Sequence, residues 1–198
     1  AQARIAELAE RGTTTGFLPF ADALATAADR STDPTRRALQ GLMPNADLER
    51  IMGGCEPGSL IIVAARPSVG KSVFGQQATT VAGRRGYASA FFSGEMPAEQ
   101  LAMRALSAYS NVPLAEIREG KASTKSGLIS DAMCKLAALP IKVDDTGGLH
   151  INQLVARARA LHRRNKLGLI VVDYLTLIRG DGDKTTDRVG DVAQRLKV

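Results

Sequence analysis

Short apolar segments alternate with helical segments along most of this 198-residue chain, and no other feature limits the fold as strongly. The predicted strands are residues 59–65, 87–92, 140–143 and 169–172. The predicted helices are residues 71–84, 97–109, 128–139 and 151–165. Strands that alternate with helices form a parallel sheet with helices on both faces. We therefore predict an α/β domain over residues 42–198.

Composition narrows the class of protein. The chain is 44% hydrophobic, which is enough for a buried core, and its net charge is 26 − 20 = +6. A basic surface suits an anionic partner such as nucleic acid, but an ordinary solvated surface explains the same charge equally well. The two cysteines, Cys55 and Cys134, lie far apart, so a disulfide scaffold or a zinc site is not expected.

Targeting signals and membrane spans are not expected. The longest apolar runs are much shorter than the roughly 20 residues that cross a bilayer. The amino terminus, AQARIAELAERG, has mixed charge and lacks the apolar core of a signal peptide. Together with the cysteine usage, these features predict a soluble protein of the cytoplasm.

Residues 1–41 differ from the rest and are interpreted as a linker region. Helices are predicted over residues 2–11 and 17–30, and the turn-like segments GTTTG and STDPTRR flank the second. Helices this short are marginal alone, so they must pack on a larger body. That body is either the core of this chain or a neighbouring subunit.

A phosphate-binding loop is predicted where the first strand leads into a helix. Gly70, Lys71 and Ser72 form the end of the pattern G-x-x-x-x-G-K-[ST], while Ala65 replaces its first glycine. Alanine is acceptable there if its φ is negative. Backbone N–H groups and the helix dipole can then hold phosphate oxygens, with Lys71 at the terminal phosphates and Ser72 on Mg²⁺. A chance G-K-S at a helix start is the alternative.

The residues predicted to bind the nucleotide are Arg66, Pro67, Ser68, Val69, Gly70, Lys71, Ser72 and Val73.

Two carboxylates follow predicted strands. Asp173 ends the apolar run 169–172, where a carboxylate beside a phosphate loop is typical of a Mg²⁺ ligand. Glu95 follows the second strand, where it can polarise an attacking water. Each has a simpler interpretation: Asp173 as an acidic strand end, and Glu95 as a helix cap ahead of Pro97.

Several segments together resemble the DnaB-type replicative helicases, in the order and approximate spacing of that family. They are LERIMGGCEPGSLIIVAARP, AARPSVGKS, FFSGEMPAEQLAMRAL, IREGKAS, IKVDDTGGLHINQLVARAR and LGLIVVDYLTLIRG. The resemblance covers residues 42–198. The segment IAELAERGTTTGFLPFADAL resembles the linker that joins the two domains of the family.

The resemblance implies a RecA-like P-loop NTPase core that hydrolyses ATP with Mg²⁺. It implies that Lys71 and Glu95 are catalytic, that Ser72 and Asp173 hold the metal, and that Asp173 is the Walker B aspartate. Arg104 and Asp144 match recurrent positions to which no role is assigned. The family forms ring hexamers that move along single-stranded DNA during DNA replication. A linker helix from Phe17 to Ala28 is expected to dock on the neighbouring subunit, and primase and a helicase loader are further candidate partners.

Some family elements are expected outside this chain, namely the strand with the phosphate-sensing glutamine, the DNA-binding loops and the arginine finger. The isolated segment is therefore expected to be inactive as a helicase. Another RecA-like hexamer, of recombinase or clock type, would share the loop and both carboxylates. A non-catalytic fragment that binds a helicase ring is the alternative from a different class.

A dense basic stretch, residues 157–166, has two interpretations. It can follow the phosphates of DNA, or it can be the solvated face of a helix, and the second interpretation is favoured.

Overall fold

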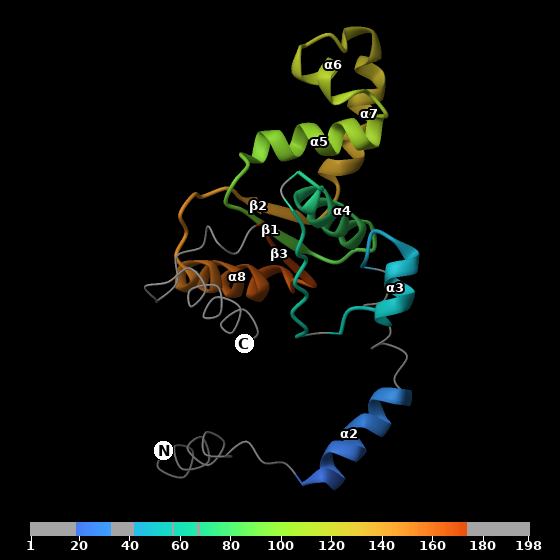
Figure 1. Ribbon diagram of the computed structural model, residues 1–198, viewed down its shortest axis with the longest axis vertical. Coiled ribbons are helices and arrows are strands. Elements are labelled where there is room, and N and C mark those ends of the chain that lie inside the picture. The colour runs from blue at the N-terminus through green and yellow to red at the C-terminus, as the bar shows by residue number, and fades with distance from the viewer. Residues whose placement is uncertain (1–18, 33–41, 57, 67, 174–198) are drawn as a thin grey trace. The chain divides into compact units, whose positions relative to one another are not determined.

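The structure is a computed structural model that describes residues 19–32, 42–56, 58–66 and 68–173 (Figure 1). The chain divides into two compact units, residues 1–38 and residues 39–198. The predicted helix over residues 2–11 lies outside the described residues.

The first unit contains helix α2 (Phe20–Thr32), which begins three residues later than the helix predicted over 17–30 and ends two residues later. Pro19 precedes it, and its carbonyl accepts a hydrogen bond from Asp22 N. Phe20 and Leu24 stand one turn apart and are 76% and 54% exposed. Two large apolar side chains on one helix face therefore remain in solvent.

The second unit is built on three parallel strands, β1 (Ser89–Ser93), β2 (Ile141–Asp144) and β3 (Leu169–Asp173). Their order is β2-β1-β3, so the strand that comes first in sequence is central. Ser89 is in register with Ile141 on one side and Leu169 on the other. The predicted parallel arrangement of these three segments is confirmed.

Helices account for most of the remaining described residues. They are α3 (Ala46–Met52), α4 (Lys71–Arg84), α5 (Ala98–Ser110), α6 (Leu114–Arg118), the 3₁₀ turn η2 (Ser123–Lys125), α7 (Ser126–Ala137) and α8 (Ile151–Asn165). The predicted bounds of α4 and α8 are correct, and those of α5 and α7 differ by one or two residues. Of the described helices, none has the length and apolar character needed to cross a membrane.

The short helix α3 was not predicted, although its sequence carries both end signals. The side chain of Asn45 accepts hydrogen bonds from the N–H groups of Asp47 and Leu48, as an N-cap does. Gly53 ends the helix in the left-handed region, with φ 71°.

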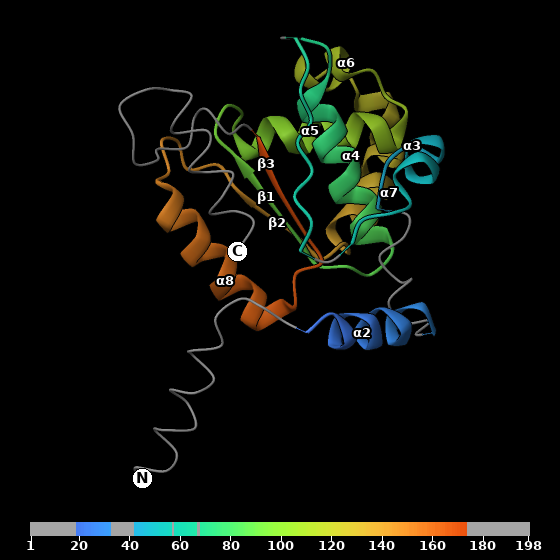
Figure 2. The same ribbon diagram turned by 60° about the horizontal axis from the view of Figure 1, so that its bottom comes forward.

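The two faces of the sheet are covered by different helices (Figure 2). On one face, Ala90 and Phe92 pack with Leu154 and Ala158 of α8 in the buried core. On the other face, α4 lies against Phe91 and Val171, which are the nearest side chains to Gly75. Because side chains alternate along a strand, Ser93 and Asp173 project to the same face as Phe91 and Val171, toward α4.

The predicted strand over residues 59–65 is wrong. The segment is irregular in the structure and pairs with none of the described strands. It joins α3 to α4 as an extended trace outside the sheet (Figure 2). Ile62 is 61% exposed and Val63 is 47% exposed, so the apolar run does not bury itself in the described part of the chain. A strand requires a partner for its N–H and C=O groups, and the described residues supply none beside this segment.

The close approach of α4 to the sheet at Gly75 gives a testable prediction. A Cβ at this position would lie 2.9 Å from Val171 Cγ1, and the β-branched valine cannot easily rotate away. Overpacking costs about 1–3 kcal/mol, which outweighs the roughly 1 kcal/mol of helix propensity that alanine gains. Gly75→Ala should therefore lower the free energy of unfolding by up to about 2 kcal/mol in urea titrations.

The matched control is Gly127→Ala in α7, where an added Cβ would meet nothing within 4 Å. This change should leave stability unchanged or raise it by about 0.5–1 kcal/mol. Equal effects of the two substitutions would contradict the packing argument.

Candidate active site

The predicted phosphate loop leads directly into α4. Gly70 is the N-cap residue and has φ 107°, a conformation that side chains other than glycine rarely adopt. Ser68 also has a positive φ, of 64°. Among the described residues, only Ser68, Asn111 and Lys166 combine a positive φ with a side chain, so the φ of Ala65 is negative. The condition under which alanine can replace the first glycine is met.

The amino terminus of α4 presents unsatisfied donors. Among the described residues no side chain caps this helix, and its first internal hydrogen bond runs from Phe74 N to Gly70 O, at 2.9 Å. The N–H groups of Lys71, Ser72 and Val73 precede that bond and have no acceptor within the helix. Such a terminus, with the helix dipole behind it, favours an anion.

The side chain of Lys71 folds back onto the loop. Its Nζ donates to the backbone carbonyls of Ala65, at 3.0 Å, and Arg66, at 3.5 Å. These acceptors are neutral, whereas hydrogen bonds from an ammonium group to charged oxygens are shorter and stronger. A phosphate would therefore compete well for this side chain. Arg66 and Val69 are exposed beside it, and Pro67 lies outside the described residues.

Asp173 is buried at the carboxyl end of β3, with 6% of its surface exposed. Its Oδ2 is shielded from solvent and has no hydrogen-bond partner in the part of the chain that the structure describes. An unpaired buried carboxylate oxygen is costly, and it is a good ligand for a hard cation. Asp173 projects toward the face that α4 covers. Its predicted grouping with Ser72, at the start of α4, stays a prediction.

The described residues contain no cluster of three or more His, Cys, Asp and Glu side chains. A Mg²⁺ site of one or two protein ligands, completed by phosphate and water, fits this donor set.

Glu95 lies in the bend between β1 and α5 and is exposed. Sequence reasoning left open whether it caps α5. The N-cap of α5 is Pro97, which makes no side-chain capping bond, and Ala98 N donates instead to Asp145 Oδ2 at 2.9 Å. The capping role therefore belongs to Asp145, which sequence reasoning did not identify.

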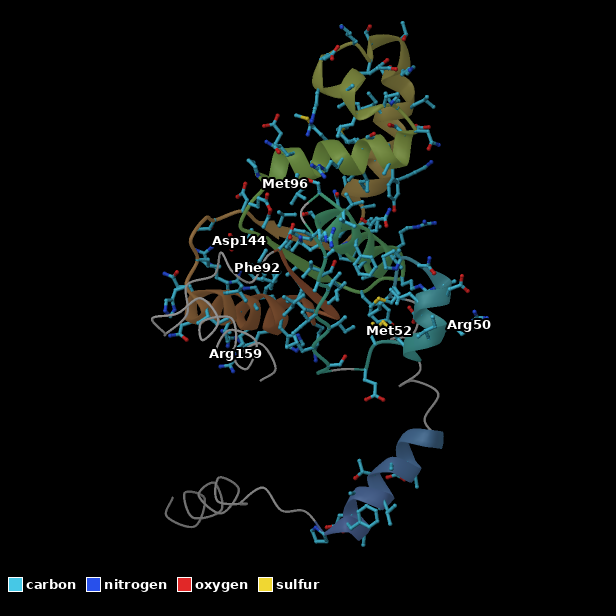
Figure 3. The ribbon with its side chains drawn as sticks, viewed as in Figure 1. Arg50, Met52, Phe92, Met96, Asp144 and Arg159 are labelled. Carbon is cyan, nitrogen blue, oxygen red and sulfur yellow. The ribbon has the colours of Figure 1, made fainter. Side chains whose placement is uncertain are left out.

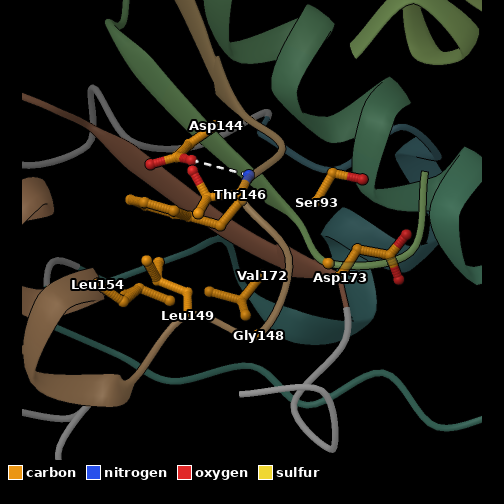
Figure 4. Close-up of a pocket in the computed structure, with 10 residues that line it drawn as sticks. Ser93, Asp144, Thr146, Gly148, Leu149, Leu154, Val172 and Asp173 are labelled. Carbon is orange, nitrogen blue, oxygen red and sulfur yellow. Dashed lines mark hydrogen bonds between the residues drawn. The ribbon is translucent and has the colours of Figure 1, made fainter. Parts of the chain in front are cut away.

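A small cavity of about 20 Å³ lies at the carboxyl ends of the strands (Figure 4). Its lining residues are Phe92, Ser93, Gly94, Asp144, Thr146, Gly148, Leu149, Leu154, Val172 and Asp173. The side chains of Ser93 and Asp173 point to one side of it, and Asp144 lies on the other (Figure 4).

Asp144 has a structural role on that second side. It accepts from Arg157 Nη1 at 2.6 Å and from Thr146 N at 3.1 Å, and Arg157 also donates to Thr146 Oγ1. Burial alone would raise the pKa of Asp144, but the hydrogen bonds from Thr146 and Arg157 and the charge of Arg157 hold the pKa below its ordinary value. The carboxylate therefore stays ionised and ties the start of the β2–α8 loop to α8.

Arg104 and the rest of the basic stretch beyond Arg157 are the other basic side chains that the sequence analysis singled out. Arg104 Nε, on α5, is buried and has no hydrogen-bond partner among the described residues. In the basic stretch, Arg159 projects from the side of α8 away from Phe92 (Figure 3), and Arg163 and Arg164 are exposed. This exposure fits a solvated helix face and equally a surface for anions.

Comparison with known proteins places these observations in a family. The model of the DnaB-like helicase C terminal domain matches residues 43–198. Replicative DNA helicase DnaC of Bacillus subtilis is 36% identical over 205 residues, which cover 100% of this chain and 45% of that protein. Replicative DNA helicase DnaB of Geobacillus stearothermophilus is 39% identical over 156 residues, which cover 76% of this chain and 34% of that protein. The chain thus spans less than half of the length of these relatives.

Solved structures agree on the fold. One solved structure, described as an ATPase domain, superposes with a TM-score of 0.80 at 21% identity, covering 90% of this chain and 66% of that one. A DnaB-like replicative helicase, studied with its primase interactions, superposes with a TM-score of 0.78 at 22% identity. The superposition covers 99% of this chain and 49% of that one. The predicted RecA-like core is confirmed at the level of the fold.

Proposed function

This chain belongs to the DnaB-like helicase C terminal domain family, and on that basis we propose that it is the ATP-hydrolysing motor domain of a replicative DNA helicase. One structural observation carries the proposal. The predicted phosphate loop leads into α4, whose amino terminus carries no side-chain cap and suits phosphate. The same helix packs on the face of the sheet that bears the unpaired carboxylate oxygen of Asp173. A nucleotide with its metal requires an anion site, here the start of α4, and a ligand for the cation, here Asp173 on β3.

Each side chain has a proposed task in ATP hydrolysis. The N–H groups at the start of α4 hold the phosphates, and Lys71 moves from its carbonyl acceptors to the terminal phosphate oxygens. Glu95, in its exposed bend, accepts a proton from the attacking water. The proposed binding residues remain those of the loop, from Arg66 to Val73.

Ser72 and Asp173 would hold Mg²⁺, and the orphaned Oδ2 of Asp173 fits that role. When bound, the metal neutralises charge that develops on the phosphate oxygens.

We extend the proposal to partners and location. Single-stranded DNA is the proposed track and a hexameric ring the proposed assembly, with primase and a helicase loader as candidate partners. The relatives named above are replicative helicases, and one solved neighbour was studied with primase. The two free cysteines among the described residues suit the reducing cytoplasm, where we place the protein.

The phosphate loop is tested by Lys71→Ala. Removing the ammonium group takes away the cation that donates to the loop carbonyl of Ala65, so the affinity for a fluorescent ATP analogue should fall at least tenfold, the equivalent of about 1.4 kcal/mol. Lys135→Ala, an exposed lysine on α7, is the control and should bind normally. Unchanged affinity of the Lys71 variant would exclude the phosphate-loop assignment.

The catalytic carboxylate is tested by Glu95→Gln in the intact protein. The amide cannot accept the proton, so the steady-state rate of ATP hydrolysis should fall about 10²–10⁴-fold while the affinity for the analogue is retained. Glu99→Gln changes another exposed glutamate, in the first turn of α5, and should hydrolyse ATP at the normal rate. Near-normal turnover by the Glu95 variant would remove Glu95 from the mechanism.

The linker helix, proposed to run from Phe17 to Ala28, is tested by oligomeric mass. Phe17 and Leu18 lie outside the described residues, whereas Phe20 and Leu24 expose large apolar surfaces whose burial against a neighbouring subunit would contribute a few kcal/mol. Phe20→Asp with Leu24→Asp should therefore reduce the mass seen by light scattering.

The control for the linker prediction is Ala25→Asp with Thr26→Asp, which adds the same charge to the opposite side of α2. It should leave the assembly unchanged, and a hexamer that survives the Phe20 and Leu24 changes would rule out docking through this face.

A further inference from the structure

The bend that carries Glu95 is anchored by a buried serine at its start. Ser93, with 2% of its surface exposed, donates from Oγ to Met96 O at 2.6 Å and accepts from Met96 N at 3.2 Å. One hydroxyl therefore satisfies both backbone groups of the residue that follows Glu95. Because Ser93 is buried, water does not compete for these bonds.

A second anchor joins the same bend to β3. Gly94 N donates to Asp173 O at 2.8 Å, and Ser93 and Asp173 are register partners in the parallel ladder. The backbone on the amino-terminal side of Glu95 is therefore fixed to the backbone of the residue proposed to bind the metal.

The third anchor comes from a distant part of the sequence. The first N–H groups of α5 need acceptors, and Pro97 supplies none from its side chain. Asp145 Oδ2 accepts from Ala98 N, 47 residues away in sequence. The neighbouring ion pair of Asp144 with Arg157 holds the loop that presents Asp145.

We propose that Ser93 and Asp145 are positioning residues that orient Glu95 for catalysis by fixing the bend at both ends. The inference rests on the proposed ATPase function. The anchors hold the backbone at residues 93, 94, 96 and 98, so Glu95 keeps only the freedom of its own side chain. Neither Ser93 Oγ nor Asp145 needs to touch the nucleotide.

The size of the expected effect follows from orientation. Misplacing a reacting group by about 1 Å can cost on the order of 10²-fold in rate. Loss of one anchor leaves the other two in place, so each single change should reduce the rate by about tenfold, less than the loss of Glu95 itself. The affinity for the nucleotide should not change, since none of the anchors belongs to the phosphate loop.

The experiment compares kcat for ATP hydrolysis with the affinity for a fluorescent ATP analogue in the intact protein. Asp145→Ala removes the acceptor and should lower kcat about tenfold at unchanged affinity. Asp145→Asn keeps an oxygen acceptor and should recover most of the turnover. Asp131→Ala, which removes an exposed carboxylate from α7, is the control for charge.

Ser93→Ala should likewise lower kcat without weakening binding. In a Glu95→Gln background, neither Ser93→Ala nor Asp145→Ala should reduce the residual rate further, because their action passes through Glu95. Asp145 is exposed, so its substitution should not prevent folding. The Asp145 variants therefore still decide the question if the variant of the buried Ser93 fails to fold.

Three results would overturn the inference. Normal turnover of Asp145→Ala beside an inactive Glu95→Gln would leave the ATPase function standing and remove the positioning role. Additive losses in the Glu95→Gln background would show that the anchors act independently of Glu95. A fully active Glu95→Gln would refute the proposed role of Glu95 and, with it, this inference.

Discussion

The parallel register between β1 and β3 is the constraint on which the candidate site depends. It pairs Ser93 with Asp173 and sends both side chains to the face that α4 covers. A shift of one residue would turn Asp173 toward the apolar core under α8, where Phe92 and Leu154 pack. The core on one face thus fixes the position of the carboxylate on the other.

Much of this arrangement could be predicted from the sequence, because its signals are local. The predicted bounds of α4 and α8 are correct, and Lys71 and Asp173 lie, as predicted, at a helix start and at a strand end. The prediction of a strand over residues 59–65 was wrong for a physical reason. A run of β-branched residues indicates a preference for a buried sheet position. A strand also needs a neighbouring strand to pair with, and the local sequence does not show whether one is present.

The anchors of the Glu95 bend could not be predicted for the same reason. Asp145 caps a helix 47 residues earlier in the chain, and the sequence pattern around Pro97 gives no sign of this partner. The sequence showed Ser93 only as a residue two positions before Glu95, although serine commonly bonds to nearby backbone groups at turns. Asp144 matched a recurrent position without a role, and its contacts with Arg157 and Thr146 now explain it as part of the loop that presents Asp145.

The electrostatic arrangement limits which ligand could satisfy the site. Lys71 rests on neutral carbonyls, the start of α4 offers uncapped N–H groups, and Asp173 holds a buried oxygen without a partner among the described residues. A simple anion would satisfy the first two features and leave the carboxylate unpaired, whereas a lone cation would satisfy only the third. A ligand that carries several negative oxygens together with a bound divalent cation satisfies all three. The proposed ligand, ATP with its Mg²⁺, is of this kind.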